Sequence, residues 1–238
     1  MFEPASYRTI STEPRSAAQN EGLRQYMLGI YRTMALGLGV TGLVALLVSS
    51  TPALYGPIFG TPLKWVVMLA PLAFVFFFTF RIERMTTATA RATFFAFAAV
   101  MGVSMASIFL VFTDLSIATA FFAAAALFLG MSLWGYTTKA DLSRFSTFLM
   151  IGLFAVVGVS LVNLFIGSSL LQTAISVVGV LVFTGLTAWD TQRLKSEYLA
   201  YAGSQNVEKL AVMGALSLYL NLINLFQLLL QLIGQREE

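Results

Sequence analysis

Long apolar stretches separated by short polar segments make up most of this 238-residue sequence. A helix needs about 20 predominantly apolar residues to cross a bilayer. Seven stretches approach that length, at residues 33–48, 65–80, 92–112, 115–135, 145–166, 170–189 and 210–233. The first two are short, and the first lengthens only by taking in Arg32 or the pair Ser49 and Ser50, so a six-span arrangement stays open. The pattern predicts an all-α integral membrane protein, a bundle of seven transmembrane helices.

The seventh span carries polar residues at helical spacing. At ~3.6 residues per turn they fall on or beside one stripe, which consists of Ser217, Asn221, Asn224, Gln227 and Gln231. Such a stripe is costly against lipid, so we expect this helix in the interior of the bundle. Its polar groups then serve either as hydrogen-bonding links between helices or as a pathway for water and ions, and both interpretations stay open.

The composition agrees with a membrane protein. The chain is 58% hydrophobic and 11% charged, with a mean hydropathy of +0.83, whereas soluble domains are roughly 45–50% apolar and about 25% charged. We expect one membrane domain at residues 26–234, between a polar N-terminal tail at 1–25 and a C-terminal tail at 235–238. The N-terminal tail lacks the apolar core and cleavage site of a signal peptide, so insertion relies on the first span.

Basic residues predict the orientation in the membrane. The N-terminal side and the second, fourth and sixth connections hold 12 of the 14 Lys and Arg residues, and the other side holds only Lys64 and Arg236. Because Lys and Arg are enriched on the cytoplasmic side, we expect a cytoplasmic N-terminus and a C-terminus outside. This distribution also explains the net charge of +3, so the expected partner is the lipid bilayer and not a nucleic acid.

The residue types exclude most catalytic chemistry. The chain has no cysteine and no histidine, which removes disulfides, thiolate metal sites, cysteine nucleophiles and imidazole catalysis. No paired carboxylates, metal cluster or nucleophile–base set is visible in the sequence. We therefore expect neither an enzyme nor a bound cofactor.

Asp190 is the one acidic residue expected at a span. The other ten of the eleven acids fall in tails or connections, and an ionisable residue in a membrane helix is a functional candidate by default. It stands at the predicted cytoplasmic end of the sixth span, beside the hydroxyls of Thr184, Thr187 and Thr191. Carboxylate, hydroxyl and amide oxygens suit Ca²⁺, although one carboxylate makes only a weak site. The alternative is an ordinary helix-end carboxylate that is solvated or paired with Arg193.

Three segments carry recognisable motifs. They read Thr-Lys-Ala-Asp-Leu-Ser at 138–143, Phe-Thr-Gly-Leu-Thr-Ala-Trp-Asp-Thr-Gln at 183–192 and Ala-Leu-Ser-Leu-Tyr-Leu-Asn-Leu-Ile-Asn-Leu-Phe at 215–226. On these segments the chain resembles the transmembrane Bax inhibitor motif family, and the similarity spans residues 24–234. Bacterial members of that family are small seven-helix proteins of the inner membrane, so the resemblance implies this location.

The resemblance also implies a pH-sensitive calcium leak. In that family two aspartates on the sixth and seventh helices share a proton and form a gate, which an arginine near the cytoplasmic end of the second helix latches. Asp190 matches the first aspartate, and Arg81 or Arg84 matches the arginine. Asn221 stands where the second aspartate is common. Because an aspartate beside an amide cannot share a proton as two carboxylates do, we expect weakened gating.

Two functions follow from these residues. The first is a calcium leak with a weak calcium site at Asp190 and Asn221, and its gate and ion pathway consist of Asp190, Asn221, Arg81, Arg84, Thr187, Ser217 and Asn224. The alternative is a non-conducting membrane regulator, similar to family members that bind a membrane-anchored AAA protease. It would act through the polar tail at 1–25, and the missing second aspartate favours it.

Overall fold

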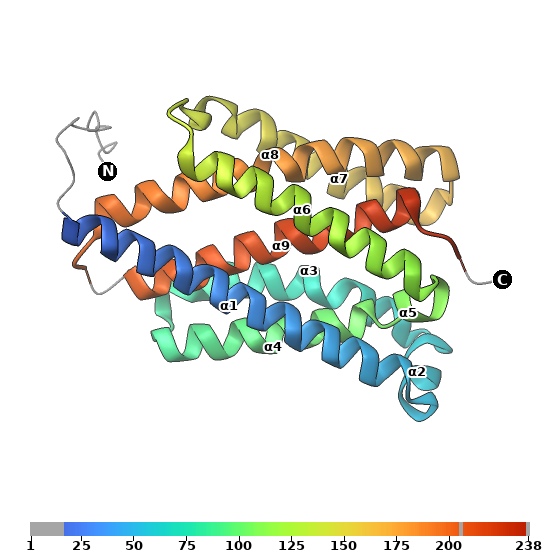
Figure 1. Cartoon of the computed structure of the whole chain (residues 1–238). Coiled ribbons are helices and arrows are strands. Elements are labelled where there is room, and N and C mark those ends of the chain that lie inside the picture. The colour runs from blue at the N-terminus through green and yellow to red at the C-terminus, as the bar shows by residue number, and fades with distance from the viewer. Residues whose placement is uncertain (1–16, 205–206, 237–238) are drawn as a thin grey trace, which may run out of the picture.

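The computed structural model describes residues 17–204 and 207–236, and these form a bundle of helices (Figure 1). The helices are α1 (Ala17–Ser49), α2 (Pro52–Phe59), α3 (Leu63–Arg81), α4 (Thr87–Met105), α5 (Ile108–Val111), α6 (Asp114–Thr137), α7 (Ser146–Ile166), α8 (Ser169–Tyr201) and α9 (Val207–Ile233), with two short 3-10 helices, η1 (Ile82–Arg84) and η2 (Leu142–Phe145). By length and composition this part of the chain has seven candidate spans, in which α4 continues into α5 and η2 into α7. The predicted all-α membrane bundle is confirmed, and the six-span arrangement is wrong.

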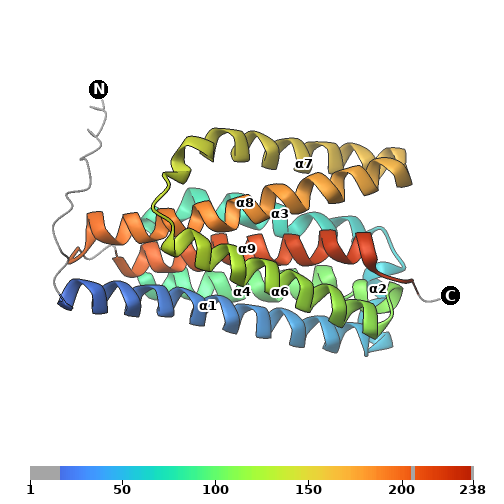
Figure 2. The same ribbon diagram turned by 45° about the horizontal axis from the view of Figure 1, so that its top comes forward.

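α9 is the central helix of the bundle (Figures 1 and 2). It packs against α8, α6, α1 and α4. Its residues Ala215, Leu218, Tyr219 and Leu225 are fully buried. A helix that is apolar around most of its circumference belongs in a core, and the polar residues of α9 are carried into the interior with it. The interior position predicted from the polar stripe is therefore confirmed.

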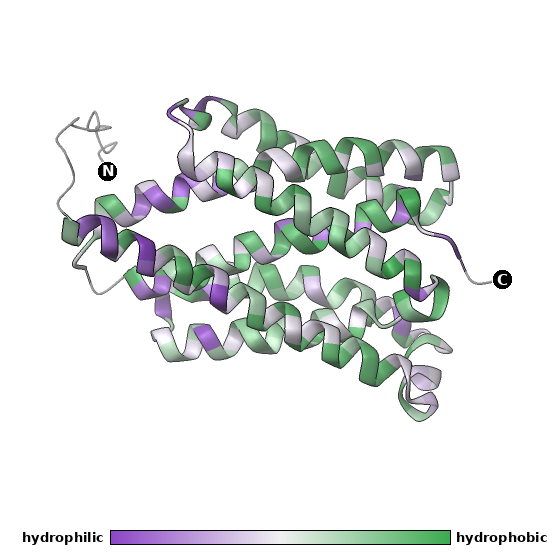
Figure 3. Cartoon of the chain, in the orientation of Figure 1, coloured by the Kyte–Doolittle hydropathy of each residue, from purple (hydrophilic) through white to green (hydrophobic). Residues whose placement is uncertain are grey.

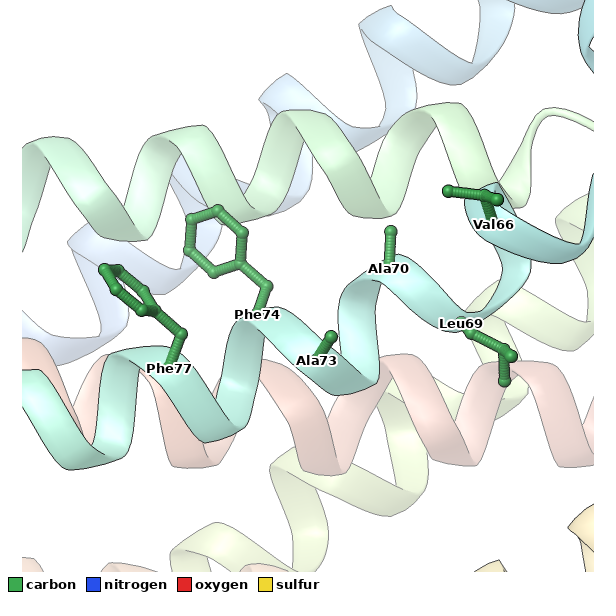
Figure 4. A pocket seen from close by; sticks show the side chains of 6 residues that line it. All are labelled: Val66, Leu69, Ala70, Ala73, Phe74 and Phe77. Atoms are coloured by element: carbon green, nitrogen blue, oxygen red, sulfur yellow. The ribbon is translucent and has the colours of Figure 1, made fainter. Parts of the chain in front are cut away.

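α3 and α7 lie at the rim of the bundle. α3 packs mainly against α4, and α7 packs against α8. Both expose large aromatic side chains, which are Phe76, Phe77 and Phe80 on α3 and Phe148, Phe154 and Phe165 on α7. An apolar groove of about 500 Å³ runs along α3 (Figure 4), and its lining residues are Val66, Leu69, Ala70, Ala73, Phe74 and Phe77. These surfaces suit contact with lipid.

The first helix begins earlier than the sequence predicts. α1 starts at Ala17, so residues 17–25 of the expected tail belong to it, while residues 1–16 lie outside the described residues. The physical reason is that this segment has something to pack against. Leu23 is 2% exposed, and the ring of Tyr26 lies 5.0 Å from that of Tyr198 on α8.

Hydrophilic segments gather at one end of the bundle, where α1 begins and α8 ends (Figure 3). The connections from α3 to α4 and from α6 to α7 lie at this end too (Figure 1). We call it the basic end, because Arg24, Arg81, Arg84, Lys139, Arg144, Arg193 and Lys195 lie in these segments. At the opposite end, the chain after α9 docks on the start of α6, where the amide of Gln235 donates to Ser116 Oγ at 2.8 Å.

Candidate functional site

Asp190 lies inside a helix and not at its end. α8 continues from Asp190 to Tyr201, so the predicted end of the sixth helix is wrong, and Arg193 and Lys195 are helical residues. The side chain of Asp190 is buried, with the residue 5% exposed. This excludes the solvated helix-end carboxylate, which was one of the two alternatives.

The carboxylate of Asp190 is held from two helices. Oδ2 accepts a hydrogen bond from Nδ2 of Asn221 on α9, at 2.8 Å. Oδ1 forms an ion pair with Nη2 of Arg193, one turn further along α8, at 2.9 Å. Asp190 and Asn221, which the sequence predicts to be neighbours, therefore face each other. The ion pair with Arg193, which the sequence analysis gave as the alternative to a functional role, is also present.

Arg193 extends the site beyond Asp190. Its Nη2 donates to Ser217 Oγ on α9 at 3.3 Å, and its guanidinium carbon lies 5.0 Å from the ring centre of Trp189. Its Nε lies 3.5 Å from Oε1 of Glu197, the next turn of α8. Arg193 thus connects Asp190, which Asn221 also contacts, to Ser217. The sequence analysis considered Arg193 only as a counter-charge for Asp190.

Glu197 is the functional candidate that the sequence interpretation missed, because it was placed in a connection. Asp190, Arg193 and Glu197 follow the i, i+3 and i+7 spacing that brings side chains onto one helical face. That spacing was a usable signal once the helix was known to continue.

Close helix packing fixes the turn of α8 that carries Asp190. Gly135 of α6 lies against it, and a Cβ atom at that position would come within 2.2 Å of the carbonyl oxygen of Ala188. Only glycine permits this approach. The backbone of α6 therefore touches α8 two residues before Asp190.

The opposite face of the same turns binds the connection between α6 and α7. Gln192 accepts from the amide of Leu142 and donates to the carbonyl of Ala140, both at 2.8 Å. Nζ of Lys195 donates to the carbonyl of Tyr136 at 2.7 Å, where a cation also complements the C-terminal end of α6. These bonds explain why α8 stays helical beyond the apolar stretch.

Two predicted pathway residues bond to their own helices. Thr187 Oγ1 donates to the carbonyl of Phe183 at 2.8 Å, and Nδ2 of Asn224 donates to the carbonyl of Leu220 at 2.8 Å. Neither makes a hydrogen bond to Asp190 or Asn221 in the described residues. Their place in an ion pathway stays a prediction.

The two predicted latch arginines lie elsewhere. Arg81 ends α3 and Arg84 ends η1, and both are exposed. The guanidinium that contacts Asp190 in this structure belongs to Arg193. A latch role for Arg81 or Arg84 stays a prediction.

The far end of the polar stripe links helices to one another. Gln231 of α9 accepts from Ser176 of α8 at 3.2 Å and also from Nε2 of Gln172. Gln172 in turn accepts from Asn163 of α7 at 3.1 Å. Hydrogen-bonding links are therefore present at this end, as one of the two interpretations of the stripe predicts.

Within the part of the chain that the structure describes, no group of three acidic residues is placed to hold a metal ion. Asp190 and Asn221 alone would supply one carboxylate and one amide. The calcium site that the sequence predicts there stays a prediction.

Comparisons with known proteins agree on one family. The family model Bax1-I, described as inhibitor of apoptosis-promoting Bax1, matches residues 23–238. The chain is 38% identical over 218 residues to the inner membrane protein YbhL of Escherichia coli K12, which covers 90% of this chain and 93% of that protein. It is 41% identical over 247 aligned residues to a protein of Caulobacter vibrioides, with 100% and 99% covered, and 39% identical over 231 residues to protein RP147 of Rickettsia prowazekii, with 97% and 98% covered. The integral membrane protein described above therefore belongs to the Bax1-I family, as its motifs predict.

Proposed function

We propose that this protein is a cation-leak protein, with calcium as the permeant ion and Asp190 as its gate. The observation that supports this most directly is the position of Asp190. The residue is 5% exposed, and its carboxylate lies against α9, the central helix of a seven-span bundle. A charged group inside a membrane protein is expensive, and such groups mark ion pathways.

The arrangement of Asp190 corresponds to a closed gate. Both carboxylate oxygens are engaged, one by Arg193 and one by Asn221. A cation that reached Asp190 would have to displace the guanidinium, because the two positive charges compete for one carboxylate. Opening then consists of breaking the Asp190–Arg193 pair and separating α8 from α9 at this level.

The orientation of the proposed leak follows from charge. We propose that the basic end faces the cytoplasm, because 12 of the 14 basic residues belong to that side in the sequence and Lys and Arg favour it. The N-terminus is then cytoplasmic and the C-terminus outside. The printed description of YbhL as an inner membrane protein supports the inner membrane as the location.

A flux measurement tests this function. Purified protein in liposomes loaded with a calcium indicator should pass Ca²⁺, and the rate should depend on pH. Asp190→Ala should change the rate strongly, and Asp141→Ala, which alters an exposed carboxylate in the α6–α7 connection, should not. If protein that is monodisperse and helical passes no Ca²⁺ at any pH, the proposed leak function is refuted.

A non-conducting regulator is the second candidate, and one observation favours it. Two cavities among the described residues are apolar; one follows α3 and the other, of about 240 Å³, is lined from α6, η2, α7 and α8. Neither is lined by Asp190 or Asn221. The exposed apolar face of α3 would then dock another membrane protein, such as a membrane-anchored AAA protease. In that case removal of residues 1–16 or bulky substitutions along α3 should abolish binding of the protease, while Asp190→Ala leaves it intact.

A further inference from the structure

Arg193 lies between two carboxylates on one face of α8. Its Nη2 is 2.9 Å from Asp190 and its Nε is 3.5 Å from Glu197. The side chains of the two acids are 7% and 30% exposed, so both are partly removed from water. A positive group in this position compensates two negative charges that would otherwise face each other.

Further groups around the guanidinium suit a cation. Ser217 presents its oxygen to Arg193 at 3.3 Å, and the face of Trp189 lies under the guanidinium, an arrangement that attracts cations.

Tyr26 of α1 supplies an independent observation. The residue is 7% exposed, and its hydroxyl has no hydrogen-bond partner among the described residues. It nevertheless lies within electrostatic range of both Glu197 and Arg193. An unpaired buried hydroxyl is costly, and near Glu197 it is a further oxygen that a cation could use.

We infer that Asp190 and Glu197, with Ser217 and Tyr26, form a divalent-cation site that the protein occupies with its own guanidinium. Glu197 then supplies the second carboxylate that Asn221 does not. With Arg193 in place the two acids and one base carry a net charge of −1, and without it they carry −2 in a partly buried place. Oxygen donors with that charge are the ligands that Ca²⁺ takes. The inference rests on the proposed function for the identity of the ion.

Terbium luminescence tests the site. Tb³⁺ is an oxygen-seeking stand-in for Ca²⁺, and Trp189 is placed to sensitise its emission. Wild type should bind Tb³⁺ weakly, because the guanidinium holds the site. Arg193→Gln should bind it about tenfold more tightly or better, since removal of a unit charge a few ångströms away has an effect of at least that size. Excess Ca²⁺ should quench the signal.

Matched variants separate the site from the rest of the surface. Arg193→Lys keeps a positive charge and should bind no better than wild type. Adding Asp190→Asn or Glu197→Gln to Arg193→Gln should return binding to the wild-type level, whereas adding Glu208→Gln, which removes an exposed acid of α9, should not. Arg144→Gln removes an exposed arginine and should leave binding as in wild type. If Arg193→Gln does not yield folded protein, Arg193→Met retains the packing of the side-chain stem on Trp189 and takes its place.

Two results would overturn the inference. One is equal Tb³⁺ affinity for wild type and the folded Arg193 variant. The other is equal affinity with and without Glu197→Gln in that variant, which would remove Glu197 from the site. The flux assay keeps the two proposals apart: Tb³⁺ binding by Arg193→Gln without flux in any variant refutes the leak alone, and flux that depends on Asp190 without such binding refutes this site alone.

Discussion

Asn221 on α9 donates a hydrogen bond from Nδ2 to Oδ2 of Asp190 on α8, over 2.8 Å. The contact joins the two helices inside the bundle, since both residues are at most 5% exposed. An amide makes this bond without any change of protonation. A carboxylate at position 221 could make it only with a proton. The side chain at 221 therefore decides whether this contact can hold a proton shared by two carboxylates.

Asp190→Ala should alter calcium flux far more than Asp141→Ala. The first removes the carboxylate that Arg193 and Asn221 hold between two central helices, and the second removes an exposed helix cap. Flux into liposomes containing the indicator, at several pH values, measures both. Equal effects would show that Asp190 is not the gate.

Asp141 suits this control for a physical reason. Hydrogen bonds from Ser143 Oγ and from the Ser143 amide, at 2.6 and 3.0 Å, lower the pKa of its carboxyl, and Arg144 adds to the effect. A pKa that is lower in the folded state gives stability that is present above the unfolded value and is lost as pH falls through the folded value. Asp141 therefore stays ionised through neutral pH and contributes no titration there.

Gly135→Ala should destabilise the bundle, because its Cβ would come within 2.2 Å of the carbonyl of Ala188. Overpacking of this kind costs typically about 1–3 kcal/mol. Gly130→Ala, on the same helix with no atom within 4 Å of the new Cβ, is the matched control and should stabilise slightly, by about 0.4–1 kcal/mol. Thermal unfolding in detergent compares them. Equal stability of the two variants would mean that α6 and α8 lie further apart at Gly135 than the structure shows.

Arg193→Gln should raise the basal cation leak, because it frees Asp190 from its ion pair. Arg81→Gln and Arg84→Gln change exposed arginines at the end of α3 and in η1 and should have little effect on the leak. The latch implied by the family resemblance predicts the opposite order, with Arg81 or Arg84 dominant. Leak rates of the three variants, measured at one pH, show whether Arg193 or an arginine at the end of α3 holds the gate closed.

A C-terminal reporter should show the C-terminus outside. Seven spans place the two termini on opposite sides, and the proposed orientation, with the basic end in the cytoplasm, puts the N-terminus there. A fused alkaline phosphatase, active only outside the cytoplasm, should therefore be active, and a fused fluorescent protein that folds only in the cytoplasm should be dark. The reverse pattern would contradict the proposed orientation or the number of spans.

The interior place of α9 could be predicted from the sequence because the signal was periodic. Polar residues from Ser217 to Gln231 recur at helical spacing among apolar ones, and lipid tolerates such a face poorly. The direction of each side chain could not be predicted. Thr187 and Asn224 turn back to carbonyls one turn before them on their own helices, a local bond that competes with contacts between helices.

The sequence also placed the end of the sixth helix too early. Hydropathy falls at Asp190, and a charged residue normally marks the end of a span. α8 continues because its charges find partners in the fold: Arg193 pairs with Asp190 and Glu197, and Lys195 bonds to the end of α6. The pairs of Arg193 are local to α8 and show in the spacing of the sequence, whereas the bond from Lys195 to α6 is long-range and leaves no mark in a single sequence.

Asn221→Asp should give the protein a steeper response to pH. The variant would place two carboxylates in the contact that now measures 2.8 Å, and two carboxylates at that distance bind a shared proton. Calcium and the proton then compete for one place, so the apparent Kd for Ca²⁺ should change by up to about tenfold per pH unit in the titrating range, the limit for one proton against one ion. Wild type, with an amide at 221, should show a shallower dependence.

Asn221→Gln is the control for this prediction, because it changes the shape of the side chain at 221 without adding a titratable group. It should weaken the contact with Asp190 and leave the pH dependence of calcium binding shallow. Isothermal titration of Ca²⁺ at a series of pH values compares wild type with both variants. A steep transition near neutral pH in wild type, unchanged by Asn221→Asp, would contradict the coupling of two acids. Asp190 would then sense protons without a partner at 221, and the carboxylate coupled to it would be that of Glu197, which shares Arg193 with it.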